Sequence, residues 1–165
     1  MRNLSADTYQ AAFEKLSAFW EKVPEARGSA IELELLGKPA AGAIPDDDTA
    51  YPWRDAIAYT WVAHILMLES LPIIEGVPNY TASMFQMAWT EASVEEQANT
   101  LARELRDDFV ATSGYDGLAA YVSYAHGDES LAEMYGERKL ERLAGLKSSW
   151  DPDNVFGFNN ALPRE

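Results

Sequence analysis

The sequence contains no cysteine. This absence excludes disulfide bonds, thiolate metal ligands, a cysteine nucleophile and any cysteinyl link to a cofactor made by this chain. It does not indicate a cellular compartment, because secreted proteins can also lack cysteine. The first residues lack the apolar core of a signal peptide, so nothing in the sequence directs the chain to secretion, and the localisation is left open.

Positive charge is also scarce. The chain has 13 lysines and arginines against 27 aspartates and glutamates, a net charge of −14. Binding to nucleic acid or to an anionic membrane needs clustered cations, so both are predicted to be poor partners. No stretch reaches the roughly 20 apolar residues that a membrane span requires.

Histidine is limited to His64 and His126, and no zinc or calcium motif is present, so no metal site is predicted. The acidic run Asp46–Asp48 is better explained as a solvated turn than as a metal site. There is no glycine-rich phosphate loop and no Gly-x-Ser-x-Gly nucleophile motif. These absences leave only a few candidates for chemistry.

What is present is typical of one globular domain: 165 residues, of which 47% are hydrophobic. Apolar periodicity predicts helices and strands along the chain. The helices are expected over 5–23, 94–110, 128–135 and 139–150, and the strands over 31–35, 55–61 and 84–89, the last of which could continue the second, with a short β-prone run over 119–124. This order predicts an α+β fold, an antiparallel sheet covered on one face by helices, with a helical carboxy-terminal tail.

Two tyrosines stand out as candidates for chemistry. Tyr121 and Tyr124 fall in the β-prone run, and we expect both rings on one face of a short strand. A tyrosine in an apolar cleft can act as a general base if its pKa is lowered from about 10. From spacing alone, two ordinary core residues are the simpler explanation.

The order of motifs towards the end of the chain bears on that choice. It runs Tyr121-Val-Ser-Tyr-Ala-His-Gly-Asp-Glu-Ser, Tyr135-Gly-Glu, Arg142-Leu-x-x-Leu-Lys147, Asp151-Pro-Asp-Asn-Val-Phe156 and Asn159-Asn-Ala-Leu, preceded upstream by Tyr51-Pro-Trp-Arg54 and Ala88-Trp-Thr90. This order resembles the berberine-bridge-like family of FAD-linked oxidases. The resemblance implies that residues 119–165 are the berberine-like carboxy-terminal segment and that residues 1–118 are part of a substrate-binding domain.

The resemblance also implies a chemistry: hydride transfer from a small organic metabolite to FAD, with a proton passed to a base. Carried over by position, Tyr124 is the expected catalytic base, and the expected substrate pocket contains Tyr121, Ser123 and His126, with Glu34 as a weaker candidate. Residues Asn154, Phe156 and Asn159 are expected to contact the cofactor. Ser123 and His126 stand where the family usually has Asn and often has Asp. Members of the family are often secreted.

Two features depart from the family. The flavin-binding domain is absent from the sequence, so FAD binding by this chain alone is doubtful and a separate flavin domain is an expected partner. Residues 61–82 are expected to be an insertion, either translated intervening sequence or a lineage-specific loop. We therefore expect a partial oxidase, inactive without its flavin domain and with exposed apolar surface. The alternatives are a stand-alone binding or scaffolding module without redox activity and one half of a split oxidase.

Overall fold

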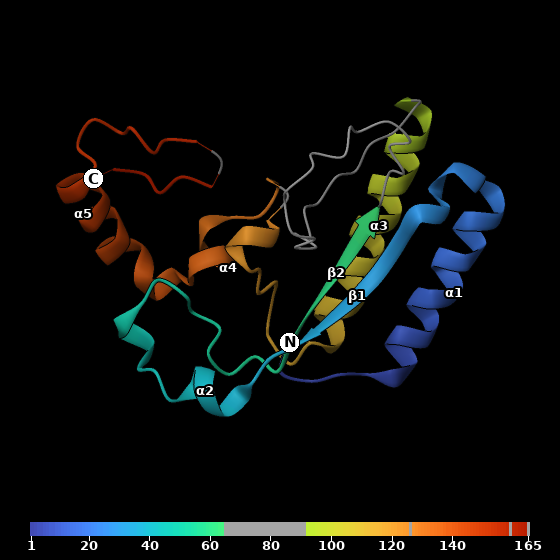
Figure 1. Cartoon of the computed structure of the whole chain (residues 1–165), viewed down its shortest axis with the longest axis horizontal. Helices are drawn as coiled ribbons and strands as arrows, with labels where there is room; N and C mark the ends of the chain where they lie inside the picture. Colours follow the sequence, from blue (N-terminus) through green and yellow to red (C-terminus); the bar gives the residue numbers. More distant parts are fainter. Residues whose placement is uncertain (65–91, 126, 159, 165) are drawn as a thin grey trace, which may run out of the picture. The chain divides into compact units, whose positions relative to one another are not determined.

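The computed structural model describes residues 1–64, 92–125, 127–158 and 160–164 (Figure 1). The chain forms two compact units. The first unit consists of Met1–Leu4, Leu33–Tyr59 and Val110–Glu165, and the second consists of Ser5–Glu32 and Thr60–Phe109. The expected insertion over 61–82 and the expected strand over 84–89 lie largely or wholly outside the described residues, and the division at residue 118 stays a prediction.

The second unit begins with helix α1, Ala6–Lys22. The side chain of Ser5 caps it by accepting a hydrogen bond from the Thr8 amide at 3.2 Å. Pro24 follows the helix and opens the 3-10 turn η1, Pro24–Gly28, because proline disfavours helical geometry in the residue before it. The predicted helix over 5–23 is thus confirmed, with both of its end signals.

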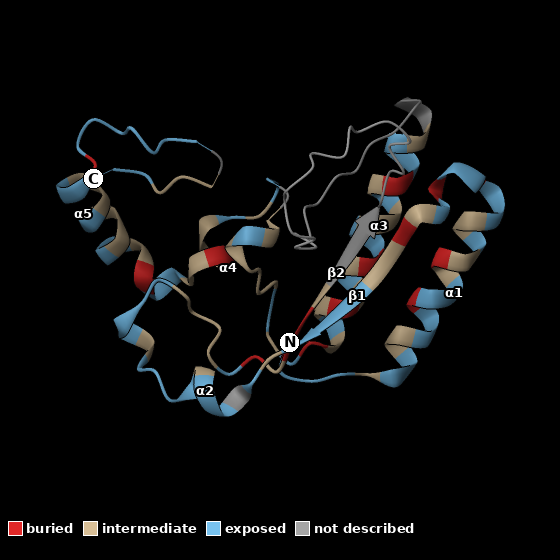
Figure 2. Ribbon diagram, viewed as in Figure 1, coloured by how far each residue is buried: buried red, intermediate tan, exposed pale blue. Residues whose placement is uncertain are grey.

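Helix α3, Ala92–Thr112, supplies the other half of this core. The ring of Phe109 lies 4.9 Å from the ring of Tyr9 on α1, and Leu105 is fully buried. At the edge of this contact, Lys15 Nζ lies 2.6 Å from a carboxylate oxygen of both Glu104 and Asp108. Figure 2 shows buried residues on both helices. The helix predicted over 94–110 is therefore confirmed and extends slightly further at each end.

Strands β1, Ser29–Leu35, and β2, Ala58–His64, pair in a two-stranded antiparallel sheet (Figure 1). The first strand was predicted within two residues. The second begins three residues later than expected, because a turn precedes it, in which the Ala56 amide donates to the Trp53 carbonyl at 3.0 Å. Towards the end of β1 the alternating apolar face is not buried, since Leu33 and Leu35 are 42% and 69% exposed.

The first unit carries the remaining short elements: α2 (Lys38–Gly42), η2 (Asp46–Asp48), η3 (Val122–Tyr124), α4 (Leu131–Tyr135), η4 (Glu137–Lys139) and α5 (Leu140–Trp150). Helix α4 starts at Ser130 because Ser130 and Glu133 form a reciprocal capping box. It ends at Gly136, whose φ of 77° favours glycine. The α+β class and the helical carboxy-terminal part are confirmed. No helix of the described residues is long and apolar enough to cross a membrane.

Candidate active site

The two tyrosines singled out from the sequence lie together, but not on a strand. Residues 122–124 form the 3-10 turn η3, so the expectation of a strand over 119–124 is wrong. Residues three apart point to opposite faces of a strand, whereas a 3-10 turn has three residues per turn and brings them to the same side. The rings of Tyr121 and Tyr124 accordingly meet edge to face, with their centroids 5.1 Å apart.

Two further tyrosines of the first unit complete a cluster that sequence reasoning did not assemble. The ring of Tyr59 stacks on Tyr121 at 5.5 Å, and the ring of Tyr51 meets Tyr121 edge to face at 6.2 Å. We call Tyr51, Tyr59, Tyr121 and Tyr124 the tyrosine cluster. Tyr51 belongs to the Tyr-Pro-Trp-Arg motif, which was a signal for it, whereas Tyr59 carried no signal beyond its place in a predicted strand.

Hydroxyl groups divide the cluster into a closed half and an open half. In the closed half, the Tyr59 hydroxyl donates to the Tyr51 hydroxyl at 2.7 Å, and the Tyr51 hydroxyl donates to the carbonyl of Trp53 at 2.9 Å. Burial raises the pKa of Tyr51, and burial together with the hydrogen bond to Tyr51 raises the pKa of Tyr59 far above its ordinary value. Both phenols therefore stay protonated at neutral pH and serve as fixed walls.

The open half ends on a carboxylate. The Tyr124 hydroxyl donates to Glu34 Oε2 at 2.7 Å, and this contact joins η3 to strand β1 across 90 residues of sequence. Glu34 is exposed to solvent, while Tyr124 is half-buried. A phenol hydrogen-bonded to a solvated carboxylate can pass its proton outward while its oxygen accepts another. This pair joins two of the residues that the sequence predicts at the site.

Of the two remaining expected pocket residues, the structure describes Ser123. Ser123 lies in η3 and is exposed, whereas Tyr121 and Tyr124 on either side of it are half-buried. His126 lies outside the described residues. The pocket roles of both stay predictions.

The two described residues expected at the cofactor, Asn154 and Phe156, lie on a loop after α5. The Asp151 carboxylate accepts hydrogen bonds from the backbone amides of Val155 at 2.7 Å and Phe156 at 3.1 Å, and it forms an ion pair with Lys147. Within this loop Asn154 has a left-handed φ of 55°, which asparagine tolerates, and its side chain is exposed. Asn159 lies outside the described residues, but its neighbour Asn160 donates to the Val122 carbonyl at 3.1 Å and so returns the tail to η3.

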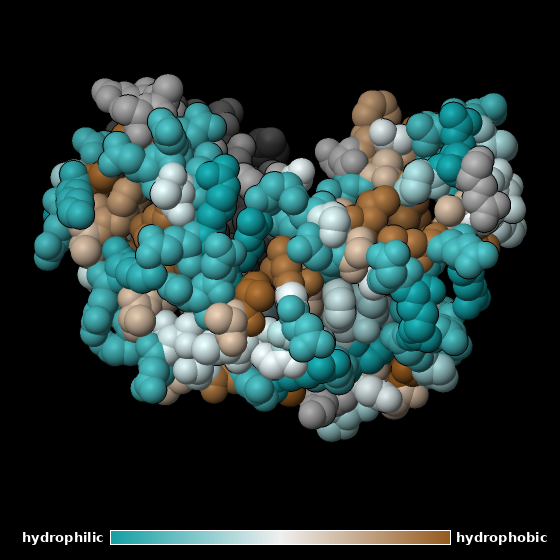
Figure 3. Space-filling view, turned by 180° about the vertical axis from the view of Figure 1, so that it is seen from behind, coloured by the Kyte–Doolittle hydropathy of each residue, from teal (hydrophilic) through white to brown (hydrophobic). Residues whose placement is uncertain are grey.

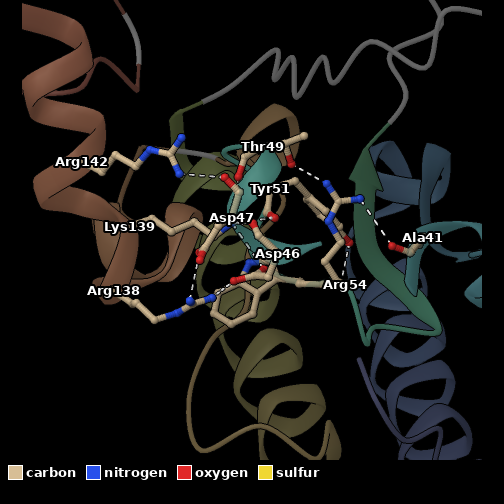
Figure 4. Close-up of polar contacts among 10 residues, drawn as sticks. Ala41, Asp46, Asp47, Thr49, Tyr51, Arg54, Arg138, Lys139 and Arg142 are labelled. Carbon is tan, nitrogen blue, oxygen red and sulfur yellow. Dashed lines mark hydrogen bonds and ion pairs between the residues drawn. The ribbon is translucent and has the colours of Figure 1, made fainter. Parts of the chain in front are cut away.

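The acidic run is held by cations of the carboxy-terminal segment (Figure 4). Arg138 pairs with Asp46 and Asp47, and the Arg142 guanidinium donates to the Asp47 carbonyl at 2.8 Å. Lys139 is buried, and its ammonium donates to the carbonyls of Asp46, Thr49 and Tyr51. The run is therefore partly neutralised rather than simply solvated. The described residues include no group that could hold a metal ion.

These residues do not form a complete FAD site. The pyrophosphate of FAD needs backbone donors of the kind that a glycine-rich loop supplies, and the sequence has no such loop. The two described residues of the expected cofactor set, Asn154 and Phe156, are exposed on the loop after α5. The arrangement sets the Tyr124 hydroxyl against the Glu34 carboxylate, but the described residues offer no cradle for the cofactor.

Comparison with known proteins shows that the chain is similar to proteins named FAD-linked oxidoreductases. The chain is 44% identical over 165 residues to the FAD-linked oxidoreductase srdI of Neurospora crassa, covering 99% of the chain and 28% of that relative. It is 44% identical over 165 residues to fogF of Aspergillus ruber, covering all of the chain and 29% of the relative. A relative from Pyricularia oryzae is 41% identical over 167 residues, with 99% of the chain and 28% of the relative covered.

The end of the chain matches a family model. Residues 120–163 match the model of the family described as "Berberine and berberine like", and this range contains η3, α4, α5 and the loop after α5. The chain is similar along its whole length to these FAD-linked oxidoreductases and ends in a berberine-like segment, so the predicted resemblance is confirmed. It spans a little over a quarter of the length of these curated relatives.

Proposed function

We propose that this chain forms the substrate-facing, proton-accepting part of an FAD-dependent oxidoreductase that oxidises a small organic metabolite. The observation that carries the proposal is the 2.7 Å hydrogen bond from the Tyr124 hydroxyl to Glu34. Tyr124 is also the residue that matches the family base by position. FAD, held by a flavin-binding domain, would supply the acceptor for the hydride.

The proton half of the reaction follows from the geometry. As the substrate loses its hydride, the proton on its oxygen or nitrogen moves to the Tyr124 oxygen, and the proton that Tyr124 carried moves to the Glu34 carboxylate. Glu34 is exposed, so it can release that proton to water. Tyr59 and Tyr51 keep their protons because burial raises the pKa of both. They orient the Tyr121 ring, which meets Tyr124, and exclude water from that side.

Exposed apolar residues support a partner for this chain. They lie on the last turns of α5 and the loop after it and comprise Leu146, Trp150, Val155, Phe156 and Phe158. Figure 3 shows hydrophobic surface on the side of the molecule where α5 and this loop lie. A stand-alone binding module would hide such surface. The described exposure therefore favours a part that docks on a flavin-binding domain, whether on the same chain or a separate one.

A chimera tests the proposal. The segment of the Neurospora crassa relative that matches this chain is replaced by residues 1–165, and flavin retention and oxidation of the parent's substrate are measured. We expect a yellow protein that turns over. Tyr124→Phe keeps the flavin and lowers kcat by about 100-fold or more, the usual range for loss of a general base. Glu34→Gln keeps Tyr124 but removes the proton acceptor, so its rate loss is expected to shrink as pH rises.

Tyr115→Phe is the matched control. Tyr115 also belongs to the first unit and also donates to a carboxylate, Asp55 at 2.6 Å, but it lies outside the tyrosine cluster. Its loss is expected to leave kcat close to that of the chimera. If the Tyr124→Phe chimera and the unmodified chimera turn over at equal rates, another group takes the proton.

A further inference from the structure

A cavity in the first unit lies apart from the tyrosine cluster. Its volume is about 480 Å³, within the range of small-molecule sites. Its apolar lining comes from Pro52, Trp53, Leu118 and Ala132. None of the four tyrosines of the cluster lines it, so the cavity is a second place where a ligand could bind.

The walls of this cavity are fixed in place. The Trp53 indole donates to the Ala120 carbonyl at 2.9 Å and meets the ring of Tyr115 at 5.3 Å, so its orientation is set from two directions. Gly136 lies so close to Pro52 that a Cβ on it would sit 3.1 Å from the proline ring. A preformed aromatic wall spares a ligand the cost of ordering it.

The charged residues around the cavity differ in whether their charge is already paired. Lys139 is satisfied by three carbonyls, and Arg138 is paired with Asp46 and Asp47. Glu133 is used by the capping box with Ser130. Glu137 is exposed, and within the described part of the chain its carboxylate makes no hydrogen bond or ion pair. The unused charge at this cavity is therefore negative.

We propose that this cavity binds a small organic cation, an ammonium group carried on an apolar body. The apolar body would fill the space between Trp53, Leu118 and Ala132, and the cationic group would lie by the indole and Glu137. Tryptophan is the side chain that attracts cations most strongly through its ring. An anion would have to displace Asp46 or Asp47 from Arg138 and would face Glu137, in a chain of net charge −14.

The test uses the chain alone and three probes of one shape: benzyltrimethylammonium, benzyl alcohol and benzoate. Each is titrated to about 20 mM, since single small fragments bind near the millimolar range. Calorimetry measures the affinity. The NMR resonance of the Trp53 indole N–H, assigned by its loss in Trp53→Leu, reports whether the probe binds in the cavity. We expect the cation to bind about fivefold or more tighter than benzyl alcohol and to shift the Trp53 resonance. Benzoate is expected to bind weakest.

Glu137→Gln is the decisive variant, because it removes charge at an exposed position and leaves the fold intact. It is expected to weaken the cation about threefold and leave benzyl alcohol unchanged. Glu141→Gln, on α5 and outside the cavity lining, is the matched control and is expected to change neither. The proposal is overturned if benzoate binds as well as the cation, if Glu137→Gln and Glu141→Gln behave alike, or if the Trp53 resonance does not move. No flavin enters the test, so its outcome is independent of the proposed oxidase function.

Discussion

Lys139 is a buried charge that contacts the segment carrying Tyr51 of the tyrosine cluster. Its side chain is 8% exposed, and its ammonium lies 2.7 Å from the Thr49 carbonyl and 3.3 Å from the Tyr51 carbonyl, with the Asp46 carbonyl as a third acceptor. The lysine thereby ties η4 to the segment that carries Tyr51. Burial lowers the pKa of Lys139, so part of the hydrogen-bond energy is offset by the cost of holding its charge away from water.

Lys139→Met keeps most of the side-chain length and removes the charge. Hydrogen bonds to a charged group contribute roughly 1.5–3 kcal/mol each, and the carbonyls left behind lose their partner. After the desolvation cost of the lysine is subtracted, we expect the free energy of unfolding to fall by about 3 kcal/mol. Urea unfolding followed by tryptophan fluorescence measures this, and near-ultraviolet circular dichroism reports whether the tyrosine rings lose their fixed packing.

Lys15→Met is the matched control, because Lys15 also contacts two acidic residues but is 34% exposed. Exposed ion pairs contribute little, so we expect a loss below about 1 kcal/mol and an unchanged tyrosine signal. The reasoning fails if Lys139→Met costs less than about 1 kcal/mol, or if the two variants are equally destabilised.

Three further changes test separate features. Ser5→Ala removes the cap of α1 and is expected to lower the free energy of unfolding by about 1 kcal/mol in urea. Gly136→Ala places a Cβ at a φ of 77° and 3.1 Å from Pro52, and we expect a loss of about 1–3 kcal/mol by the same assay, whereas Gly42→Ala, where nothing lies within 4 Å, should cost little. The hydrogen bond from Lys147 lowers the pKa of Asp151 below its ordinary value of 3.8. A carboxylate whose pKa is lowered in the folded protein stabilises the folded state at pH values above its unfolded-state pKa. Protection of the loop amides from hydrogen exchange should therefore persist above about pH 4 and fall as the pH drops further. In Asp151→Asn this pH dependence should be lost.

The sequence predicted the long helices well because their signals are local. Ser5 and Pro24 bracket α1 within a few residues, and the apolar spacing of α3 reports the face that Leu105 and Phe109 bury. The prediction failed at residues 119–124, where β-prone residues form a 3-10 turn. Short runs follow their tertiary contacts more than their propensity, and here the Val122 carbonyl is held by Asn160.

The residues of the candidate site also differ in how far the sequence predicted them. Tyr124 and Tyr121 were found because they are close in sequence and sit in a motif. The hydrogen bond between Tyr124 and Glu34 spans 90 residues, and no local pattern encodes a contact of that range. Tyr59 was placed on a strand, but its role as a buried donor to Tyr51 depends on three-dimensional packing.

The exposed apolar residues of the loop after α5 lie on a backbone that hydrogen bonds hold in place. Asp151 fixes the amides of Val155 and Phe156, and Lys147 donates both to Asp151 and, at 2.8 Å, to the Phe156 carbonyl. These bonds hold the backbone while leaving the Phe156 side chain 78% exposed. A backbone ordered by a buried ion pair, with its large apolar side chains turned outward, is the arrangement expected of a surface that another protein surface covers. The same loop returns through Asn160 to η3, so a partner docked there would lie next to the segment that carries Tyr124.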